Sequence, residues 1–436
     1  MRYGIKTSFG LLAAACVAMT VAGCGSTTTA PAQKAQDPIA ARGVAAVEPA
    51  ADPRPLGAAD TAFALDVMRA WCAQYPKQNL VFSPSTLASA LGMAYLGARG
   101  TTAQAMARVL HLPAAGAGAL AAQLQARSKA LDALDGPGVT LAASDQVWAD
   151  PTLPTLRGYL DAVATGYNAG VYKAPFSSDP EQAADEINQS ISDATRGHIS
   201  RLVTPGMISD VGWVLTSALY MNAKWATPFD AHQTVPASFT PAGAAPVSVP
   251  FMNGGGFRFA TADGWTAVSL PYQGGKLAMT ALLPPSGSGS CALPAAAGLS
   301  AMAATLAGGG TGGAGGTGGT TDVSLPKVNL SVTGGTGNMN GELNRLGMGL
   351  AFGHSANFSG LSPQACCIGF VQQAATLQVG EKGTVGTAAV AVGITPTAAR
   401  APQPAVVFDR PYLMLVTAVS TGEPLFLAKV ANPAAG

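Results

Sequence analysis

The segment EKGTVGTAAVAVGITPTAARAPQPAVVF, residues 381–408, joins a strand-forming half to a loop-forming half. Residues 383–395 carry no charge and no proline, and their Val, Ile, Thr and Ala residues alternate with Gly at a spacing that suits a β-strand. Residues 397–404 contain Arg, Pro, Gln and small residues, the composition of an exposed loop. An exposed, uncharged strand-forming segment favours aggregation, so its retention indicates a use. The alternative is an ordinary interior strand followed by an ordinary loop.

Short motifs flank this segment on both sides. VFDRPYL at 407–413 and GEPLFLAKVANP at 422–433 resemble the C-terminal signature of the serpin family, and EKGT at 381–384 resembles the hinge of that family at a spacing that agrees with it. Blocks upstream match further serpin elements in the expected order: NLVFSPSTLASALGMAYLGARGTTAQAM (79–106), WVLTSALYMNAKWATPFD (213–230), VSLPYQGGKLAMTALLP (268–284) and LPKVNLSV (325–332). The resemblance implies an α+β serpin fold, with about eight or nine helices around a large central mixed sheet, two smaller sheets and an exposed reactive-centre loop.

The composition is that of a chain that can bury a large core. Hydrophobic residues make up 48% and charged residues 11% of the 436 residues, and Gly reaches 53. Removal of an export segment and a linker leaves about 375 residues, which one domain can hold. Residues 57–436 are therefore predicted to form one serpin domain, which we expect to be a monomer. The net charge is +1 with no long basic or acidic run, which gives no support for nucleic-acid binding.

The N-terminus is predicted to be an export signal with a lipid attachment site. Arg2 and Lys6 precede an apolar run at 9–22 that is too short and too Ala-rich for a comfortable membrane span. VAGC at 21–24 resembles the cleavage box of bacterial lipoproteins, so Cys24 is predicted to be lipidated. This predicts a signal peptide at 1–23, a disordered tether at 24–56, and a lipid that holds the exported protein on the bacterial cell envelope, periplasmic or at the surface. The alternative is a plain signal peptide with an incidental cysteine.

Four cysteines remain once Cys16 and Cys24 are set aside. They are Cys72, Cys291, Cys366 and Cys367, and in an oxidising compartment they allow three full pairings. Adjacent cysteines are poorly placed to bond each other, so we predict at most one bridge, from Cys366 or Cys367 to one of the other two. Cys72 can instead be a buried thiol. No spacing of Cys and His suggests zinc, and we expect neither a metal nor another cofactor.

No enzyme motif is convincing, and we expect the protein not to be an enzyme. The four histidines are scattered, and neither a Gly-x-Ser-x-Gly elbow nor a phosphate-binding glycine loop is present. Ser324 and Lys327 match Ser-x-x-Lys, but the segment contains Pro326, reads as a strand and lacks a Lys-Thr-Gly partner. A hydrolase that uses Ser324 is a remote alternative.

The resemblance implies a suicide inhibitor of serine proteases, with cysteine proteases as a further option. The protease attacks the exposed loop and forms an acyl-enzyme, and the cut loop then enters the central sheet as an extra strand before water can release the protease. The energy for insertion is stored in a native sheet that can accept one more strand. The alternative is a non-inhibitory serpin-fold envelope lipoprotein that acts as a binding or scaffold module.

The predicted hinge carries no obstacle to insertion. It comprises Glu381, Gly383, Thr384, Val385, Gly386, Thr387, Ala388 and Ala389. In an inserted strand the even-numbered positions from 384 to 394 would share one face and the odd-numbered positions from 385 to 393 the other. A charge at Thr384, the first residue to enter, would have to lose its hydration, so its absence favours an inhibitor. Val385 stands where inhibitory serpins often carry Glu, which is a mild departure.

The resemblance also implies a polar cluster under the point where the sheet opens and a tryptophan at the breach. The sheet-opening cluster is Ser83, Thr86, Ser217 and Gln373, and the breach residue is Trp225. Ser217 stands where the family usually has Asn, and Gln373 where it usually has His. Both replacements can still form hydrogen bonds, so the cluster is expected to persist with a different geometry.

Two bonds are candidates for the scissile bond. Counting forward from the hinge by the family's usual interval places it between Thr397 and Ala398, whereas counting back from the C-terminal signature places it between Arg400 and Ala401. Thr397 would suit an elastase- or subtilisin-like protease with a small apolar pocket, and Arg400 a trypsin-like one. We favour Thr397, because the hinge count sets the length of strand available for insertion.

Overall fold

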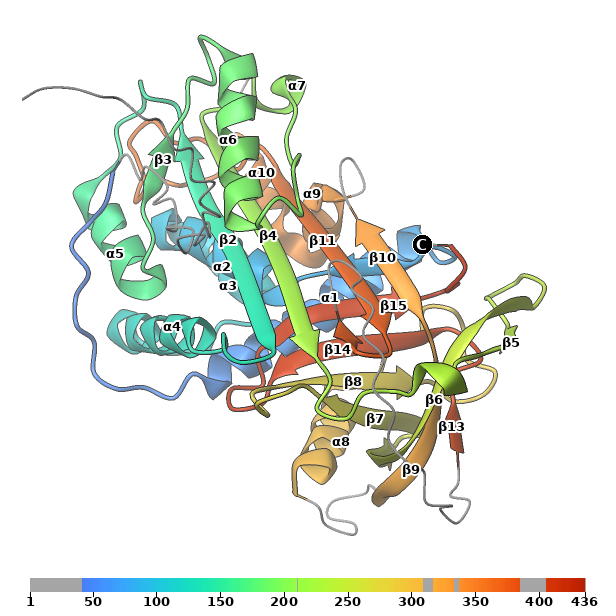
Figure 1. The fold of residues 1–436 in the computed structure, drawn as a ribbon. Coiled ribbons are helices and arrows are strands. Elements are labelled where there is room, and N and C mark those ends of the chain that lie inside the picture. Colours follow the sequence, from blue (N-terminus) through green and yellow to red (C-terminus); the bar gives the residue numbers. More distant parts are fainter. Residues whose placement is uncertain (1–40, 210, 309–316, 333–336, 385–404, 436) are drawn as a thin grey trace, which may run out of the picture. The chain divides into compact units, whose positions relative to one another are not determined.

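Two β-sheets with helices packed on them organise the chain (Figure 1). The computed structural model describes residues 41–435 except 210, 309–316, 333–336 and 385–404. All of these residues belong to one contacting unit, Asp37–Gly436.

The central sheet has six described strands of mixed direction. In spatial order they are β10 (Val328–Val332), β11 (Val371–Gly380), β12 (Gly383–Thr384), β4 (Trp213–Lys224), β2 (Val139–Ala149) and β3 (Val171–Lys173). β4 runs antiparallel to β2 and parallel to β11, while β12 is antiparallel to both β4 and β11. The predicted mixed central sheet is therefore confirmed.

β4 is apolar on both faces because both faces of the central sheet are covered there. Its sequence WVLTSALYMNAK is buried over its first nine residues. Leu215 and Leu219 join the main core, whereas Val214 and Ala218 pack with buried residues of α6 (Pro180–Ala194), which lies over the opposite face (Figure 1). A strand covered on two sides gives a continuous apolar run instead of an alternating one.

The second sheet has nine described strands and is mostly antiparallel. In spatial order they are β1 (Leu80–Phe82), β15 (Pro424–Val430), β14 (Tyr412–Ala418), β8 (Leu277–Leu283), β7 (Trp265–Pro271), β6 (Val247–Ala262), β9 (Thr317–Pro326) and β13 (Ala405–Val407), with β5 (Val235–Phe239) paired to β6. The two smaller sheets that we expected form one hydrogen-bonded network here. The reason is that the 16-residue strand β6 pairs with β5, β7 and β9.

The helices cover the sheets and fill the space between them. Besides α6 they are α1 (Arg54–Gln74), α2 (Pro84–Gly97), α3 (Gly100–Val109), α4 (Ala117–Asp132), α5 (Arg157–Tyr167), α7 (Pro205–Ile208), α8 (Ala296–Gly308), α9 (Asn340–Leu343) and α10 (Gly349–Phe352), with a 3-10 turn at Ala231–Gln233 and a π turn at Asn344–Met348. α2 contacts β2, β4 and β15, which explains why nearly all of its side chains are buried. Among the residues described, no helix is both long and apolar enough to span a membrane.

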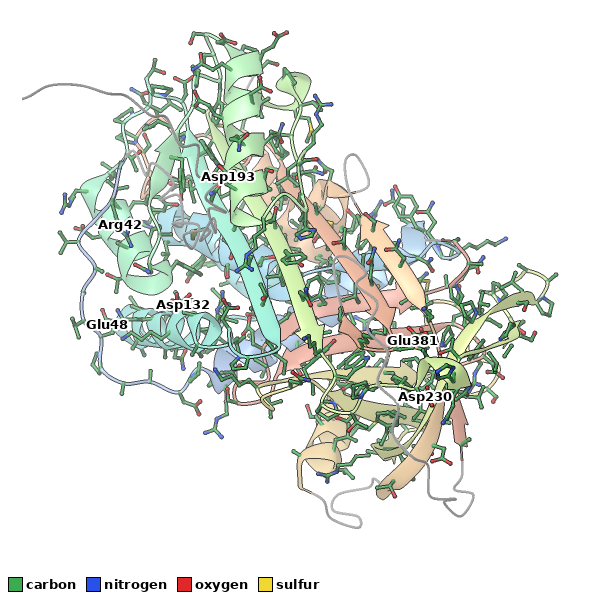
Figure 2. The ribbon with its side chains drawn as sticks, in the orientation of Figure 1. Arg42, Glu48, Asp132, Asp193, Asp230 and Glu381 are labelled. Carbon is green, nitrogen blue, oxygen red and sulfur yellow. A yellow bond between two sulfur atoms is a disulfide. The ribbon has the colours of Figure 1, made fainter. Side chains whose placement is uncertain are left out.

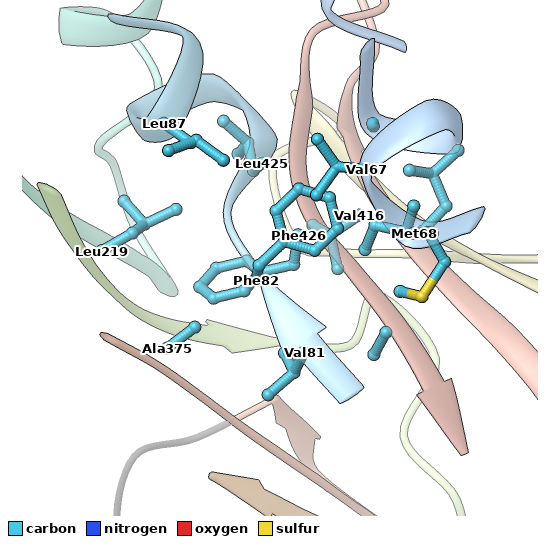
Figure 3. Packing of buried hydrophobic residues seen from close by; sticks show 14 of the residues in the cluster. Val67, Met68, Val81, Phe82, Leu87, Leu219, Ala375, Val416, Leu425 and Phe426 are labelled. Carbon is cyan, nitrogen blue, oxygen red and sulfur yellow. The ribbon is translucent and has the colours of Figure 1, made fainter. Parts of the chain in front are cut away.

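The main core lies where both sheets meet α1 and α2 (Figure 3). Phe82 of β1 and Phe426 of β15 are fully buried there, together with Leu87 of α2 and Leu219 of β4. Burial of each such side chain contributes about 1.5–3 kcal/mol. This core therefore ties the central sheet to the second sheet directly beneath the segment that would open.

Residues 41–53 differ from the expectation of a disordered tether over 24–56. Their main chain bonds to three elements of the domain: Ala41 bridges Val171 of β3, the Val44 N–H donates to Asp161 of α5, and the Glu48 N–H donates to Gln125 of α4. Figure 2 labels Arg42 and Glu48 on this segment. The low content of large apolar residues suggested disorder, but these contacts are made mainly by backbone N–H and C=O groups, which composition does not report.

A disulfide joins Cys72 of α1 to Cys291, so the pairing that we predicted is wrong. The two Cα atoms lie 5.7 Å apart although 219 residues separate them in sequence. Cys366 and Cys367, which were expected to supply one partner, are free. The pairing depends on the packing of α1 beside α8, a contact that no spacing of cysteines encodes.

Candidate functional site

Two hinge residues already lie inside the central sheet. Gly383 and Thr384 form β12, which is inserted between β11 and β4. The register pairs Gly383 with Gly380 and Lys224, and Thr384 with Val379 and Ala223. Residues 383–395, the uncharged stretch that we call the bait segment, therefore have strand neighbours on both sides at their start.

Beyond β12, the strands β11 and β4 pair directly with each other. Their parallel register runs from Val371 opposite Leu215 to Ala375 opposite Leu219. The two strands are thus joined at one end and separated by β12 at the other. Further insertion would have to replace these five residue pairs with pairs to the new strand.

The space between β11 and β4 explains why the two residues of β12 are threonine and glycine. Thr384 is 1% exposed, and its hydroxyl lies 2.6 Å from the hydroxyl of the buried Tyr272. Gly383 has φ +154°, and a Cβ there would stand 2.1 Å from the carbonyl oxygen of Ala223. Only glycine permits β4 to approach so closely at this backbone angle. Burial raises the pKa of Tyr272, so its phenol stays neutral and can donate to Thr384.

Glu381 holds the chain just before β12 (Figure 2). Its carboxylate accepts hydrogen bonds from the Thr234 hydroxyl at 3.0 Å and from the Lys327 ammonium at 3.1 Å. Its carbonyl oxygen accepts from the Phe229 N–H at 2.8 Å. Burial by itself would raise the pKa of Glu381, but its own backbone N–H, Lys327 and Thr234 outweigh burial and lower it. Glu381, predicted as part of the hinge, therefore fixes the position of the chain at the start of β12.

Trp225, the predicted breach residue, lies at the end of the central sheet where β12 separates β11 from β4. It is 1% exposed and stacks on Tyr272 at a centroid distance of 4.5 Å. Its indole N–H donates to the carbonyl oxygen of Gly380 at 2.8 Å, and its backbone N–H donates to Lys382 at 2.9 Å. One side chain thus fixes the last residue of β11 beside the hinge.

The structure brings the predicted sheet-opening cluster together. Gln373 of β11 lies directly opposite Ser217 of β4. The Gln373 side-chain oxygen accepts from the Ser83 N–H at 3.4 Å, and the Ser83 hydroxyl accepts from the Thr86 N–H at the start of α2 at 3.4 Å. All four residues are buried. They lie under the pairs of β11 and β4 that insertion would separate.

A second group of polar residues, largely withdrawn from solvent and not predicted from the sequence, adjoins this cluster. Asp145 of β2 lies opposite Ser217. Burial raises the pKa of Asp145 to about 8, opposed by Arg127 and by the hydroxyls of Ser217 and Ser89. Arg127 of α4 is 3% exposed and reaches the hydroxyl of Ser89 as well. The only sequence signal was an acid inside a strand that is otherwise mostly uncharged.

Arg127 also holds two further buried acids. It donates to Asp60 of α1 at 2.6 Å and lies 3.9 Å from Glu423. Burial raises the pKa of both acids, and the neighbouring Asp60 raises that of Glu423 further. Glu423 belongs to the C-terminal signature, so this motif contributes to a buried charge network as well as to β15.

Several predicted site residues lie outside the described part of the chain. They are Cys24, the hinge residues Val385, Gly386, Thr387, Ala388 and Ala389, and the candidate scissile residues Thr397, Ala398, Arg400 and Ala401. Their roles stay predictions. Ser324 is described: it lies in β9, and Lys327 is engaged with Glu381.

Comparison with known proteins agrees with this arrangement. The family model described as "Serpin (serine protease inhibitor)" matches residues 58–433. The chain is 31% identical to serpin-Z6C of Oryza sativa subsp. japonica over 81% of its own length and 91% of the relative, and 28% identical to the leukocyte elastase inhibitor of Sus scrofa over 87% and 99%. Uncleaved ovalbumin superposes with a TM-score of 0.73 at 21% identity, covering 87% of this chain and 100% of ovalbumin. By sequence and by fold, the chain belongs to the serpin family.

Proposed function

We propose that this protein is a suicide inhibitor of serine proteases, and that it traps the acyl-enzyme by inserting its cleaved loop between β11 and β4. The serpin family includes inhibitors such as the leukocyte elastase inhibitor, and its members are mostly inhibitors and not enzymes. Cysteine proteases, which form an analogous acyl-enzyme, are a further possible class of target.

The observation that carries the proposal is the position of β12. Gly383 and Thr384 pair with β11 and β4 at once, which supports entry of the rest of the loop at this place and in this register. Extended by the same register, Val390 would lie between Gln373 and Ser217, within the sheet-opening cluster. Successive residues of the added strand would bond alternately to β11 and to β4, and the two ladders formed in this way would drive insertion forward.

The sequence of the bait segment also favours insertion into the sheet. Its residues up to Thr395 are uncharged, so none needs a buried partner when it enters the sheet. The four side chains of the sheet-opening cluster are uncharged and can exchange hydrogen-bond partners when the two strands separate, which favours insertion.

The first test mixes the full chain with pancreatic elastase, subtilisin or trypsin at equimolar ratio. We expect one of these proteases to form a complex that survives boiling in SDS, because the acyl bond is covalent. Protease with its active-site serine blocked in advance is the control and should form no such complex. Clean cleavage of the loop without a complex would overturn the inhibitor and favour the binding or scaffold module.

A second experiment locates the scissile bond. Mass spectrometry of the released C-terminal fragment should show Ala398 as its first residue if an elastase- or subtilisin-like protease is the target, and Ala401 if a trypsin-like one is. Arg400→Ala should leave the first outcome unchanged and abolish the second. We expect the fragment that begins at Ala398.

We propose in addition that Cys24 is lipidated and that the lipid attaches the exported protein to the bacterial cell envelope. The support is the motif at 21–24 behind a short apolar run. In a bacterial host, the wild-type protein should fractionate with membranes and incorporate labelled fatty acid, while Cys24→Ala should be soluble and unlabelled. Membrane association of Cys24→Ala would contradict the anchor.

A further inference from the structure

The segment between α10 and β11 holds a cysteine pair beside a histidine. His354 follows α10 by two residues, and Cys366 and Cys367 precede β11 by a few residues. The Sγ atom of Cys366 lies 3.8 Å from Nδ1 of His354 and 2.7 Å from Sγ of Cys367. One ligand atom from each of the three residues falls within 4.8 Å of the others.

Backbone hydrogen bonds hold both halves of this group in place. The Ala356 N–H donates to Gly353 at 2.9 Å, which closes a turn around His354. The Ile368 N–H donates to Ala351 at 2.9 Å, which fixes the residue after Cys367 against α10. Ile368 itself is buried. The three side chains are therefore brought together by ordered backbone on both sides, which lowers the entropy cost of binding a ligand.

The other common roles of a cysteine pair fit less well. Cys72 and Cys291 are bonded to each other, so neither is available to Cys366 or Cys367. Two sulfurs and an imidazole nitrogen form a donor set suited to a thiophilic metal.

The distances agree with a tetrahedral metal after a small adjustment. Zinc bonds of about 2.3 Å to sulfur and about 2.0 Å to nitrogen place S and N roughly 3.5 Å apart and two sulfurs roughly 3.8 Å apart. The His354–Cys366 distance is already close to this value. The two sulfurs have to move apart, and the third ligand distance, from His354 to Cys367, is within 4.8 Å.

We propose that His354, Cys366 and Cys367 bind one zinc(II) ion, with water in the fourth position. His354 and Cys366 are exposed, so the ion can enter from solvent and keep an open coordination position. The site links the turn after α10 to the residues that lead into β11. Binding does not depend on the inhibitory loop, so the site can be tested separately from the proposed function.

The test titrates the reduced full-length protein with Co²⁺ as a spectroscopic probe and then with Zn²⁺. We expect one equivalent of Co²⁺ to produce thiolate-to-cobalt charge-transfer absorption, which Zn²⁺ abolishes. Cys366→Ser, Cys367→Ser and His354→Gln should each weaken binding by at least about tenfold, since the loss of even an outer-shell partner costs roughly 10–100-fold. His232→Gln, an exposed histidine elsewhere, is the matched control and should bind like the wild type.

A second measurement keeps the proposal falsifiable if a variant folds poorly. X-ray absorption on the zinc-loaded wild-type protein should show two sulfur ligands and one imidazole nitrogen. Binding in the Cys366→Ser/Cys367→Ser double variant as tight as in the wild type would overturn the site. So would unchanged affinity in His354→Gln, or a zinc ion with only nitrogen and oxygen ligands.

Discussion

Thr384 is the residue at which the proposed strand insertion would begin, and it is already buried in the uncut sheet, with 1% of its surface exposed. Its hydroxyl bonds to Tyr272, and its backbone pairs with β11 and β4. A charged side chain here would have to leave water without a partner, at a cost of several kcal/mol. The hinge is therefore the position where one substitution should separate inhibition from folding.

Thr384→Arg should convert the inhibitor into a substrate. We expect the protease to cut the variant without forming an SDS-resistant complex, because an arginine cannot occupy the buried place that Thr384 holds in β12; the hinge then stays outside the sheet, and insertion slows by more than about a hundredfold while hydrolysis is unchanged. Ser238→Arg, which adds the same charge at an exposed position of β5, should inhibit normally. Undiminished inhibition by Thr384→Arg, in a protein with normal circular dichroism, would count against strand insertion.

Asp145 should make the stability of the protein depend on pH. Its pKa rises from 3.8 to about 8 on folding. Between these values the folded protein keeps a proton that the unfolded chain releases, so the contribution of this group to stability is full in acid and falls as pH rises towards 8. The slope attributable to it is up to about 1.4 kcal/mol per pH unit.

Urea unfolding at several pH values from 5 to 9 would measure this slope. The free energy of unfolding of Asp145→Asn should decline less steeply than that of the wild type over pH 5–8. The buried Asp60 and Glu423 supply the remaining decline. Asp193→Asn, on the exposed face of α6, should keep the wild-type slope. Identical slopes in the wild type and Asp145→Asn would show that this carboxyl does not titrate differently on folding.

At the scale of elements, the register of β12 decides which bait positions face the core. Thr384 points into the core beside Val379, so alternate positions beyond it would follow. Extension of the register would place Ala388 opposite Ala375 and Leu219, both in the main core. It would place Val385 on the other face, beside the partly exposed Gln378 of β11.

This difference predicts opposite effects of one substitution at two nearby positions. Val385→Glu should preserve inhibition, since the carboxylate can reach solvent after insertion. Ala388→Glu should yield mostly cleaved, uncomplexed protein, since its carboxylate would be buried among apolar side chains. Both variants are compared by their stoichiometry of inhibition against the protease that forms an SDS-resistant complex with the wild type. Equal behaviour of the pair would show that the register of β12 does not continue into the inserted strand.

At the scale of the whole molecule, the uncut sheet pairs β11 directly with β4 where another strand could enter. Insertion here would replace the one β11–β4 ladder with two, one on each side of the new strand, and would bury further apolar side chains. The intact protein would then be less stable than a form of itself that has been cut.

Cleavage of the loop should therefore raise the melting temperature. Intact and nicked protein would be compared by thermal unfolding followed by circular dichroism, with protein incubated beside inactivated protease as the control. We expect the nicked form to unfold at clearly higher temperature and to show added strand content. Equal melting temperatures would mean that no strain is released, and the trapping mechanism would fail with it.

Much of the fold was predictable because its signals are local. The apolar run of β4, the Ser83 cap of α2 and the C-terminal signature each lie within a short stretch of chain and occur in a recognisable order. Trp225 and the four residues of the sheet-opening cluster could be named for the same reason. Alternation of side chains then indicates the faces of the bait strand without knowledge of its neighbours.

The tertiary structure decided whatever depends on contact between distant segments. The bridge from Cys72 to Cys291, the docking of residues 41–53, the network around Arg127 and Asp145, and the meeting of His354 with two cysteines all join parts of the chain with no shared pattern. Hydrophobic periodicity reports burial along one element, but it does not report which polar atom of another element comes within bonding distance. That distance is set by the packing of whole helices and sheets, which only the folded chain contains.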